Sequence, residues 1–229
     1  AQRIDEATWM SAATKAQAKD KLENFIIKIG YPDKWKDYSG LQVDDSLSLY
    51  ENMGNISEFF AKDAIARKVN KPVDKMEWGM TPQTINAYYN PTTNEICFPA
   101  AILQPPFFDP TADDAMNYGG IGGVIGHEMS HGFDDQGSQF DKTGNQHNWW
   151  TAADKKNFEA RTKILVDHFN KIELAGKKVN GQMTLGENIG DNGGLNIAFR
   201  ALQNVMKTEK LGVKDGFTPE QRFFLAWAR

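Results

Sequence analysis

Residues 127–131, His127-Glu128-Met129-Ser130-His131, are the stretch around which this sequence is organised. On a helix, two histidines four residues apart project from one face, so their ring nitrogens can converge on one metal ion. Glu128 lies one position round the helix from the first histidine, which places a carboxylate beside a metal-bound water without binding the metal. A zinc ion held in this way lowers the pKa of its water, and the carboxylate takes the proton as the water attacks a carbonyl. The pattern predicts this chemistry, and the alternative is a surface helix with two unrelated histidines.

The helix that carries the histidines is unusually rich in glycine. Each glycine inside a helix costs about 1 kcal/mol relative to alanine, so tertiary packing must enforce this helix. Glycine also lets a neighbouring backbone approach closely, and a local rule broken this often indicates a functional site. The glycines in or just before the helix are Gly119, Gly120, Gly122, Gly123 and Gly126.

The composition is that of a globular protein. The chain has 229 residues, of which 40% are hydrophobic and 24% charged, and its formal net charge is −4. This length allows a sizeable core in one domain or slightly more. The mild acidity gives no electrostatic footprint for nucleic acid or a membrane surface, no apolar run reaches membrane-spanning length, and no signal peptide is evident. The single cysteine, Cys97, excludes an internal disulfide framework and is expected to be a small buried hydrophobic residue.

Capping residues and periodicity predict a mostly helical chain with one hairpin. Thr8 is the expected cap of the first helix. Thr151 with Asp154 matches a capping box at the helix that begins at residue 151. Residues 84–89 have strand composition, residues 90–94 form a turn and residues 95–98 read as the returning strand. Prolines then exclude regular structure until about residue 113. The predicted helices are residues 7–29, 46–69, 151–174 and 184–207, together with the histidine helix.

A catalytic zinc needs a third protein ligand and one open position. A metzincin would have glycine and histidine three and six residues after His131, but those positions hold Asp134 and Gly137. Families whose glutamate ligand follows the second histidine by about twenty residues are disfavoured, because residues 149–152 hold no acidic residue. His147, in a polar turn, and His168, on an amphipathic helix, are poor candidates.

Glu187 is the best remaining candidate, on its own glycine-flanked helix. Asp191 lies one turn further on the same face and can accept a hydrogen bond from a ligating histidine. The alternative is a pair of solvated acids on a surface helix. Asp134 and Asp135 follow His131 too closely to double back easily as ligands, although they can serve to orient one.

Several long motifs closely resemble the neprilysin and endothelin-converting-enzyme family of zinc endopeptidases. The similarity runs in order from about residue 8 to the end. With one cysteine, the chain looks like a bacterial member, an oligopeptidase of the family, rather than a disulfide-rich animal enzyme. The motifs that carry the resemblance are residues 86–89, 98–108, 117–122, 126–135 and 185–194.

The resemblance implies a role for each site residue. His127, His131 and Glu187 would bind one zinc ion. Glu128 would be the general base that activates the water and passes the proton to the leaving amine, and Asp191 would support a ligating histidine. The resemblance also implies that an extended peptide is bound by strand addition, through Asn86 and the backbone of Ala87.

The implied fold is a thermolysin-like zincin catalytic domain, mainly α with a small β-sheet (α+β). Residues 1–78 are expected to be a helical segment that connects to a second lobe, and residues 79–229 the catalytic domain, truncated at its C-terminus. The last residues, 221–229, form an apolar helical pattern without a cap, so the chain is expected to be a fragment with N- and C-terminal segments missing. In the family, a histidine that stabilises the tetrahedral intermediate and a substrate-binding arginine lie beyond this end. Loss of one such group costs about a hundred- to a thousandfold in rate, so the fragment is expected to bind zinc and cleave weakly.

The function expected from the sequence is therefore zinc-dependent endopeptidase activity on small and medium peptides. The alternative is a non-catalytic peptide-binding module that retains the zincin fold, which the presence of Glu128 disfavours. A purely structural zinc is disfavoured because only three protein ligands are evident. The expected partners are peptide substrates, without nucleic acid, and the expected location is periplasmic or secreted, with a cytoplasmic location as the alternative.

Overall fold

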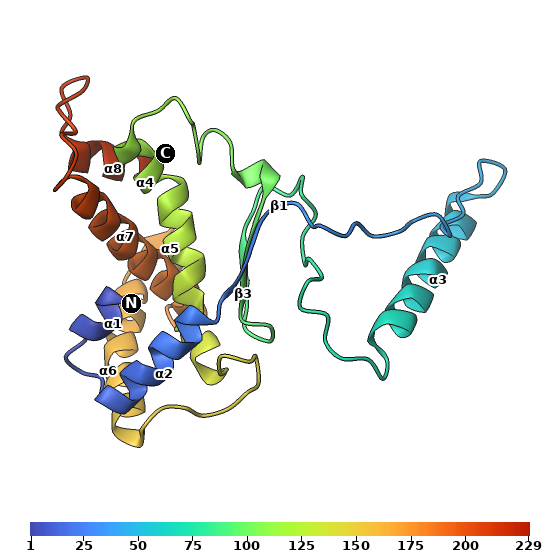
Figure 1. Cartoon of the computed structure of the whole chain (residues 1–229), viewed down its shortest axis with the longest axis horizontal. Helices are drawn as coiled ribbons and strands as arrows, with labels where there is room; N and C mark the ends of the chain where they lie inside the picture. Colours follow the sequence, from blue (N-terminus) through green and yellow to red (C-terminus); the bar gives the residue numbers. More distant parts are fainter. The chain divides into compact units, whose positions relative to one another are not determined.

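The computed structural model describes all 229 residues, which fall into two compact units (Figure 1). One unit combines residues Ala1–Tyr31 with Met80–Arg229, and the other is Pro32–Gly79. The sequence predicted one segment of residues 1–78. In the structure, residues 1–31 instead make their contacts with the unit that contains the histidine helix.

Helices make up most of the regular secondary structure of the first unit, which confirms the predicted fold class of a mainly α protein with small sheets. The histidine helix, α5, lies side by side with α7, and α4 packs against α8 (Figure 1). Gly126 on α5 meets Gly194 on α7, where an added Cβ would come within 2.7 Å of the Gly194 Cα. This contact explains the glycine content of both helices, because any side chain there would push them apart. The helices are α1 Gln2–Glu6, α2 Ala12–Glu23, α4 Asp114–Gly119, α5 Ile121–His131, α6 Ala152–Phe169, α7 Leu185–Val205 and α8 Pro219–Trp227, with 3-10 turns η1 Ala100–Ile102 and η2 Gly137–Gln139.

A three-stranded sheet of order β1-β3-β2, in which β1 is Ile26–Gly30, packs beside α5. The predicted hairpin is confirmed, with β2 (Tyr88–Asn90) antiparallel to β3 (Glu95–Pro99). Its first strand begins at residue 88 instead of 84, so β2 is short and lies at an edge of the sheet. A separate two-stranded hairpin joins β4 (Glu173–Leu174) to β5 (Lys177–Lys178).

The prediction of one helix over residues 7–29 was wrong at its C-terminal end. Helix α2 ends at Glu23, and Ile26–Gly30 form β1, which pairs in parallel with β3. The isoleucines at 26, 27 and 29 favour an extended backbone. The buried ammonium of Lys28 meets Glu95 of β3 at 2.7 Å, which ties this strand to the sheet.

Other helix ends and caps also differ from the prediction. Ser11, not Thr8, caps α2. The helix that begins after Thr151 ends at Phe169 instead of 174. Thr151 caps it, but the Asp154 carboxylate accepts hydrogen bonds from Ser11 and Thr14 of the α2 N-terminus instead of completing a capping box. These bonds attach α2 to α6.

Two apolar clusters hold the unit together. The first lies between the sheet and α5, and the second between α4, α7 and α8. Cys97 is fully buried, as predicted. The buried members of the first cluster are Ala87, Ile96, Phe98, Ile102 and Ile121, and those of the second are Ala115, Ala198, Leu202 and Phe223.

The second unit contains one helix, α3 (Leu49–Lys68). Ser48 and Glu51 form a capping box at its start, and the helix continues unbroken through Gly54. Arg67 near its end pairs with Asp63 and Glu77. None of the helices in the chain is both long and apolar enough to cross a bilayer.

Candidate metal centre

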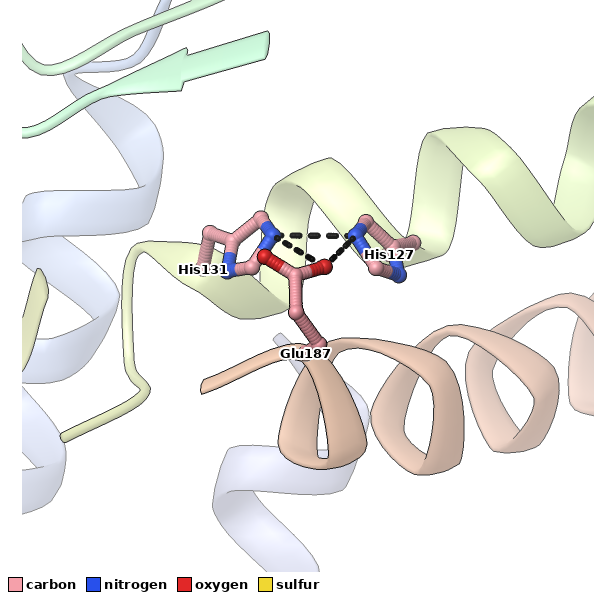
Figure 2. A group of neighbouring side chains, drawn as sticks. All are labelled: His127, His131 and Glu187. Carbon is pink, nitrogen blue, oxygen red and sulfur yellow. Dashed lines mark hydrogen bonds and ion pairs between the residues drawn. The ribbon is translucent and has the colours of Figure 1, made fainter. Parts of the chain in front are cut away.

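Two neighbouring helices bring His127, His131 and Glu187 together. The histidines lie one turn apart on α5, and Glu187 lies in the first turn of α7. Figure 2 shows the three side chains pointing toward one another. The two Nε2 atoms are 2.9 Å apart, and Glu187 Oε2 lies 3.3 Å from Nε2 of His127 and 3.8 Å from Nε2 of His131. The three residues that the sequence singled out therefore converge on one point.

The glycines of α7 allow this convergence. A Cβ at Gly190 would come 2.9 Å from ring atoms of His127, and one at Gly194 would come 2.5 Å from the His127 backbone nitrogen. Helix α7 can therefore lie directly against the histidine ring and backbone. Close approach of the two helices is what brings Glu187 within reach of both rings.

A carboxylate orients each histidine from its far side. His127 Nδ1 lies 2.9 Å from Asp191 Oδ1, and His131 Nδ1 lies 2.7 Å from Asp134 Oδ2. An ionised carboxylate only accepts hydrogen bonds, so both rings donate from Nδ1 and present the Nε2 lone pair to the centre. Two lone pairs facing each other at 2.9 Å repel unless a cation lies between them.

The separations of the three ligand atoms fit zinc. A tetrahedral ion with ligands at about 2.0–2.1 Å places neighbouring ligand atoms about 3.3 Å apart, and the separations of 2.9, 3.3 and 3.8 Å bracket that value. Two histidines with one carboxylate is a donor set of catalytic zinc, which keeps a fourth position open. The Glu187 side chain is 71% exposed, so the ligand group lies at the surface of the unit.

Asp134 is buried and tightly bound. Its Oδ1 accepts hydrogen bonds from the backbone N–H groups of Gln136 and Gly137, at 2.8 and 2.6 Å. Burial opposes protonation of His131, but the hydrogen bond and charge of Asp134, together with nearby carboxylates, raise the pKa of that ring. The sequence allowed Asp134 or Asp135 to orient a ligand, and the structure gives this contact to Asp134.

Glu128 is buried on α5 between the histidines, with 6% of its surface exposed. Burial raises the pKa of its carboxyl, against the opposing charges of His127 and His131 and a hydrogen bond from the backbone of Tyr89. A carboxyl with a raised pKa takes up and releases a proton more readily near neutral pH. The contact with Tyr89 in β2 had no signal in the sequence, because it joins distant segments.

Asn86 and Ala87 lie immediately before β2. The Asn86 side chain accepts a hydrogen bond from the Ala87 backbone N–H at 2.9 Å, and Ala87 is buried in the first apolar cluster. These residues precede the edge strand and do not pair in the sheet. The ligand group includes neither His147 nor His168.

A cavity of about 610 Å³ lies beside the ligands. Its lining includes Tyr89 of β2, the ligands His131 and Glu187, and Met183 just before α7. A larger cavity of about 710 Å³, between α6 and the 135–150 segment, includes none of the three ligand side chains. The smaller cavity is therefore the one that opens onto the metal centre.

Comparison with known families gives one consistent match. Residues 86–229 match a model described as Peptidase family M13, and residues 1–32 match a second model with the same description. The first match covers more than half of the chain and includes the three candidate metal ligands, Glu128 and Asp191.

Known proteins similar to the chain include a neprilysin, an endothelin-converting enzyme and a zinc metalloprotease. Neprilysin-11 of Caenorhabditis elegans is 42% identical over 98% of this chain and 28% of its own length, and endothelin-converting enzyme 1 of Rattus norvegicus is 41% identical over 96% and 30%. The crystal structure of the zinc metalloprotease Zmp1 of Mycobacterium tuberculosis with an inhibitor superposes with a TM-score of 0.94, at 50% identity over 98% of this chain and 35% of that chain. PepO of Lactobacillus rhamnosis superposes with a TM-score of 0.87, at 36% identity over 99% and 35%. The chain thus spans about a third of the length of these relatives.

Proposed function

The chain belongs to peptidase family M13, and we propose on that basis that the protein is a zinc-dependent endopeptidase of small and medium peptides, with residues 79–229 in its catalytic domain. One observation carries the proposal: His127, His131 and Glu187 present three ligand atoms within 4.8 Å of one another. The buried Glu128 lies on α5 with the two histidines and interacts electrostatically with all three residues.

Each side chain has a distinct role in the proposed reaction. His127, His131 and Glu187 hold the ion, and Asp191 and Asp134 keep the two rings in the tautomer that binds it. Zinc, when bound there, makes a water molecule more acidic and polarises the peptide carbonyl. Glu128 accepts a proton from the attacking water and delivers it to the leaving amine.

The edge of the sheet is the proposed place for the peptide backbone. Strand β2 pairs with β3 on one side only, and the cavity beside it reaches His131 and Glu187. An extended peptide that adds to this edge would lie along β2 and the preceding residues Asn86 and Ala87. The Ala87 N–H, now bonded to the Asn86 side chain, would then exchange that bond for one to the substrate.

The substrate range and location belong to the same proposal. We infer peptides rather than folded proteins as substrates, and an extracytoplasmic site of action, which fractionation of the source cells would check. The 229-residue chain spans about a third of its relatives, and we expect it to bind zinc while cleaving peptides weakly compared with the complete protein.

The variant Glu128→Gln tests the proposed mechanism. It keeps the shape of the side chain and removes its capacity to take a proton, so turnover in the complete protein should fall by about 10²- to 10⁴-fold while one zinc per chain is retained. Zinc content is measured by atomic absorption, and turnover with fluorogenic peptides.

Glu173→Gln, at an exposed carboxylate on β4, is the control and should cleave normally. Normal turnover by Glu128→Gln would contradict the assigned base. A zinc-loaded wild-type protein that binds peptides without cleaving them would support the binding module instead.

A further inference from the structure

Lys21 is a buried cation without an ion pair. It lies on α2, far from the histidine helix in sequence, and only 1% of its surface is exposed. Its ammonium donates hydrogen bonds to two backbone carbonyls, those of Gly137 at 2.6 Å and Phe140 at 2.8 Å. Burying a charge is costly unless it is compensated, so its position calls for a reason beyond packing.

The turn that Lys21 binds is the one that contains Asp134. The Gly137 carbonyl accepts from Lys21, and the Gly137 N–H donates to Asp134 Oδ1 at 2.6 Å. Asp134 Oδ2 in turn meets His131 Nδ1 at 2.7 Å. A continuous chain of contacts therefore runs from the Lys21 ammonium through one residue of the turn and one carboxylate to a metal ligand.

This turn has little freedom to adjust. A Cβ added at Gly137 would come 1.8 Å from the His131 carbonyl oxygen, so the backbone of the turn lies directly against the end of α5. A displacement of Gly137 would therefore move both the support of Asp134 and the backbone next to His131. The Lys21 ammonium holds Gly137 in place through the hydrogen bond that it donates to the Gly137 carbonyl.

The charge of Lys21 also suits this place. Burial lowers its pKa to about 8, against the opposing charges of Asp134 and Asp141, so the ammonium form prevails at neutral pH. The Tyr89 and Phe133 rings lie with their centroids 5.7 and 5.8 Å from the ammonium. The positive charge of Lys21 attracts the Asp134 carboxylate, whose Oδ2 accepts the hydrogen bond from His131 Nδ1.

Lys21 is also anchored through its backbone. Its carbonyl accepts a hydrogen bond from Asn94 Nδ2 at 3.1 Å, and Asn94 Oδ1 accepts one from the Tyr89 hydroxyl at 2.9 Å. The position of Lys21 relative to the β2–β3 hairpin is therefore set independently of the turn it supports.

We propose that Lys21 is a positioning residue for the metal centre, which holds the 134–140 turn so that Asp134 orients His131. The inference rests on the metal site proposed above. The N-terminal segment would thus contribute to metal affinity. Nothing in the sequence around Lys21 indicates this role, and Lys21 lies more than 100 residues before His127.

The test compares Lys21→Met with Lys28→Met in the full 229-residue chain. Both substitutions remove the charge of a buried lysine, but Lys28 pairs with Glu95 inside the sheet. We expect Lys21→Met to weaken zinc binding roughly tenfold in chelator competition, at the lower end of the effect of removing an outer partner. We also expect it to alter the visible absorption spectrum of the cobalt-substituted chain. Lys28→Met should lower the unfolding midpoint while the zinc affinity and cobalt spectrum stay those of the wild type.

A double-mutant cycle with Asp134→Asn tests the route of the effect. If Lys21 acts through Asp134, Lys21→Met should weaken zinc binding much less in the Asp134→Asn background than in the wild type. Additive effects would overturn the proposed route.

The remaining outcomes are equally decisive. Wild-type affinity and spectrum in Lys21→Met would overturn the proposal, as would equal losses in the Lys21 and Lys28 variants, while the proposed metal site would stand. A wild-type chain that binds neither zinc nor cobalt would refute the metal site itself. If Lys21→Met does not fold, Lys21→Arg decides, since it keeps the charge but displaces the two carbonyls: an altered cobalt spectrum supports the role, and an unchanged one overturns it.

Discussion

The two histidines of the centre are supported by regions of opposite character. His127 is oriented by Asp191 on α7, whose side chain is 54% exposed. His131 is oriented by Asp134, whose side chain is 7% exposed and which also accepts two backbone hydrogen bonds. One support is an exposed carboxylate carried by a helix, and the other is a buried carboxylate held within a polar turn.

The difference shows two ways of fixing a ligand. On the α7 side, precision comes from the close approach of two helices at Gly126 and Gly194, so the carboxylate itself needs few contacts. On the turn side, it comes from hydrogen bonds in a buried environment, which are stronger than in water and costly to leave unmade. A bulkier side chain between the helices should therefore disturb the α7 side most. Loss of a hydrogen-bonding group should disturb the turn side most.

The largest effect is expected from Gly194→Ala. Its Cβ would lie 2.5 Å from the His127 nitrogen and 2.8 Å from the Gly123 carbonyl, both backbone atoms that cannot turn away. The helices must then separate, with a loss of about 3 kcal/mol in the free energy of unfolding and weaker zinc binding. Urea denaturation and chelator competition measure the two effects.

Gly54→Ala is the matched control for this substitution. Gly54 also lies within a helix, but a Cβ there meets nothing within 4 Å. Alanine should stabilise α3 by about 1 kcal/mol through helix propensity, without changing zinc affinity. If Gly194→Ala is tolerated as well as Gly54→Ala, the helix contact is not what positions the α7 side.

Asp134→Asn and Asp191→Asn compare the two carboxylates directly. The Asp134 variant should bind zinc about 10- to 100-fold more weakly and lose stability, because its amide group cannot accept from His131 and both backbone donors as the carboxylate does. The Asp191 variant should lose less affinity and little stability, since solvent already solvates that carboxylate. Isothermal titration in the apo chains and thermal unfolding give both quantities.

Salt separates the two supports further. At 1 M salt, the loss of zinc affinity in Asp191→Asn relative to the wild type should shrink, because exposed charges are screened. The loss of zinc affinity in Asp134→Asn should persist. An equal salt response in the two variants would argue against the contrast in burial as its cause.

Asp154, like Asp134, is a buried carboxylate that accepts several hydrogen bonds, but it lies outside the metal centre. The variant Asp154→Asn tests what such a carboxylate contributes to stability alone. Hydrogen bonds from Ser11, Thr14 and Thr151 hold the pKa of Asp154 well below its ordinary value. The ionised form therefore stabilises the fold at neutral pH, and that stability is lost as pH falls below the ordinary value of 3.8 toward the lowered one. Asp154→Asn should be less stable than the wild type at pH 7, and the gap should narrow as the pH is lowered below about 4.

Zinc affinity is the control measurement for Asp154→Asn and should equal that of the wild type. A stability gap that stays constant from pH 7 to pH 3 would show that the ionised form of Asp154 contributes nothing.

Local patterns in the sequence were enough to find most of the centre. Helix spacing puts His127 and His131 on one face, and a second glycine-flanked helix made Glu187 the best third candidate. The first strand was missed because no proline or glycine separates Ile26–Gly30 from the lysine- and alanine-rich helix α2. What makes it a strand is its partner: β3 supplies the hydrogen bonds and Glu95 supplies the charge that receives Lys28.

By itself, the sequence predicted the candidate ligands, the proposed catalytic carboxylate and the helices that carry them, because spacing along a helix converts directly into position on one face. Only the tertiary structure decided how those groups are held: Asp191 beside His127, Asp134 beside His131, the backbone of Tyr89 on Glu128, and Lys21 under the turn. Each of these contacts except that of Asp134 joins segments distant in the chain. Their energies depend on burial and on the approach of separate backbones, and neither quantity is encoded in any local stretch of residues.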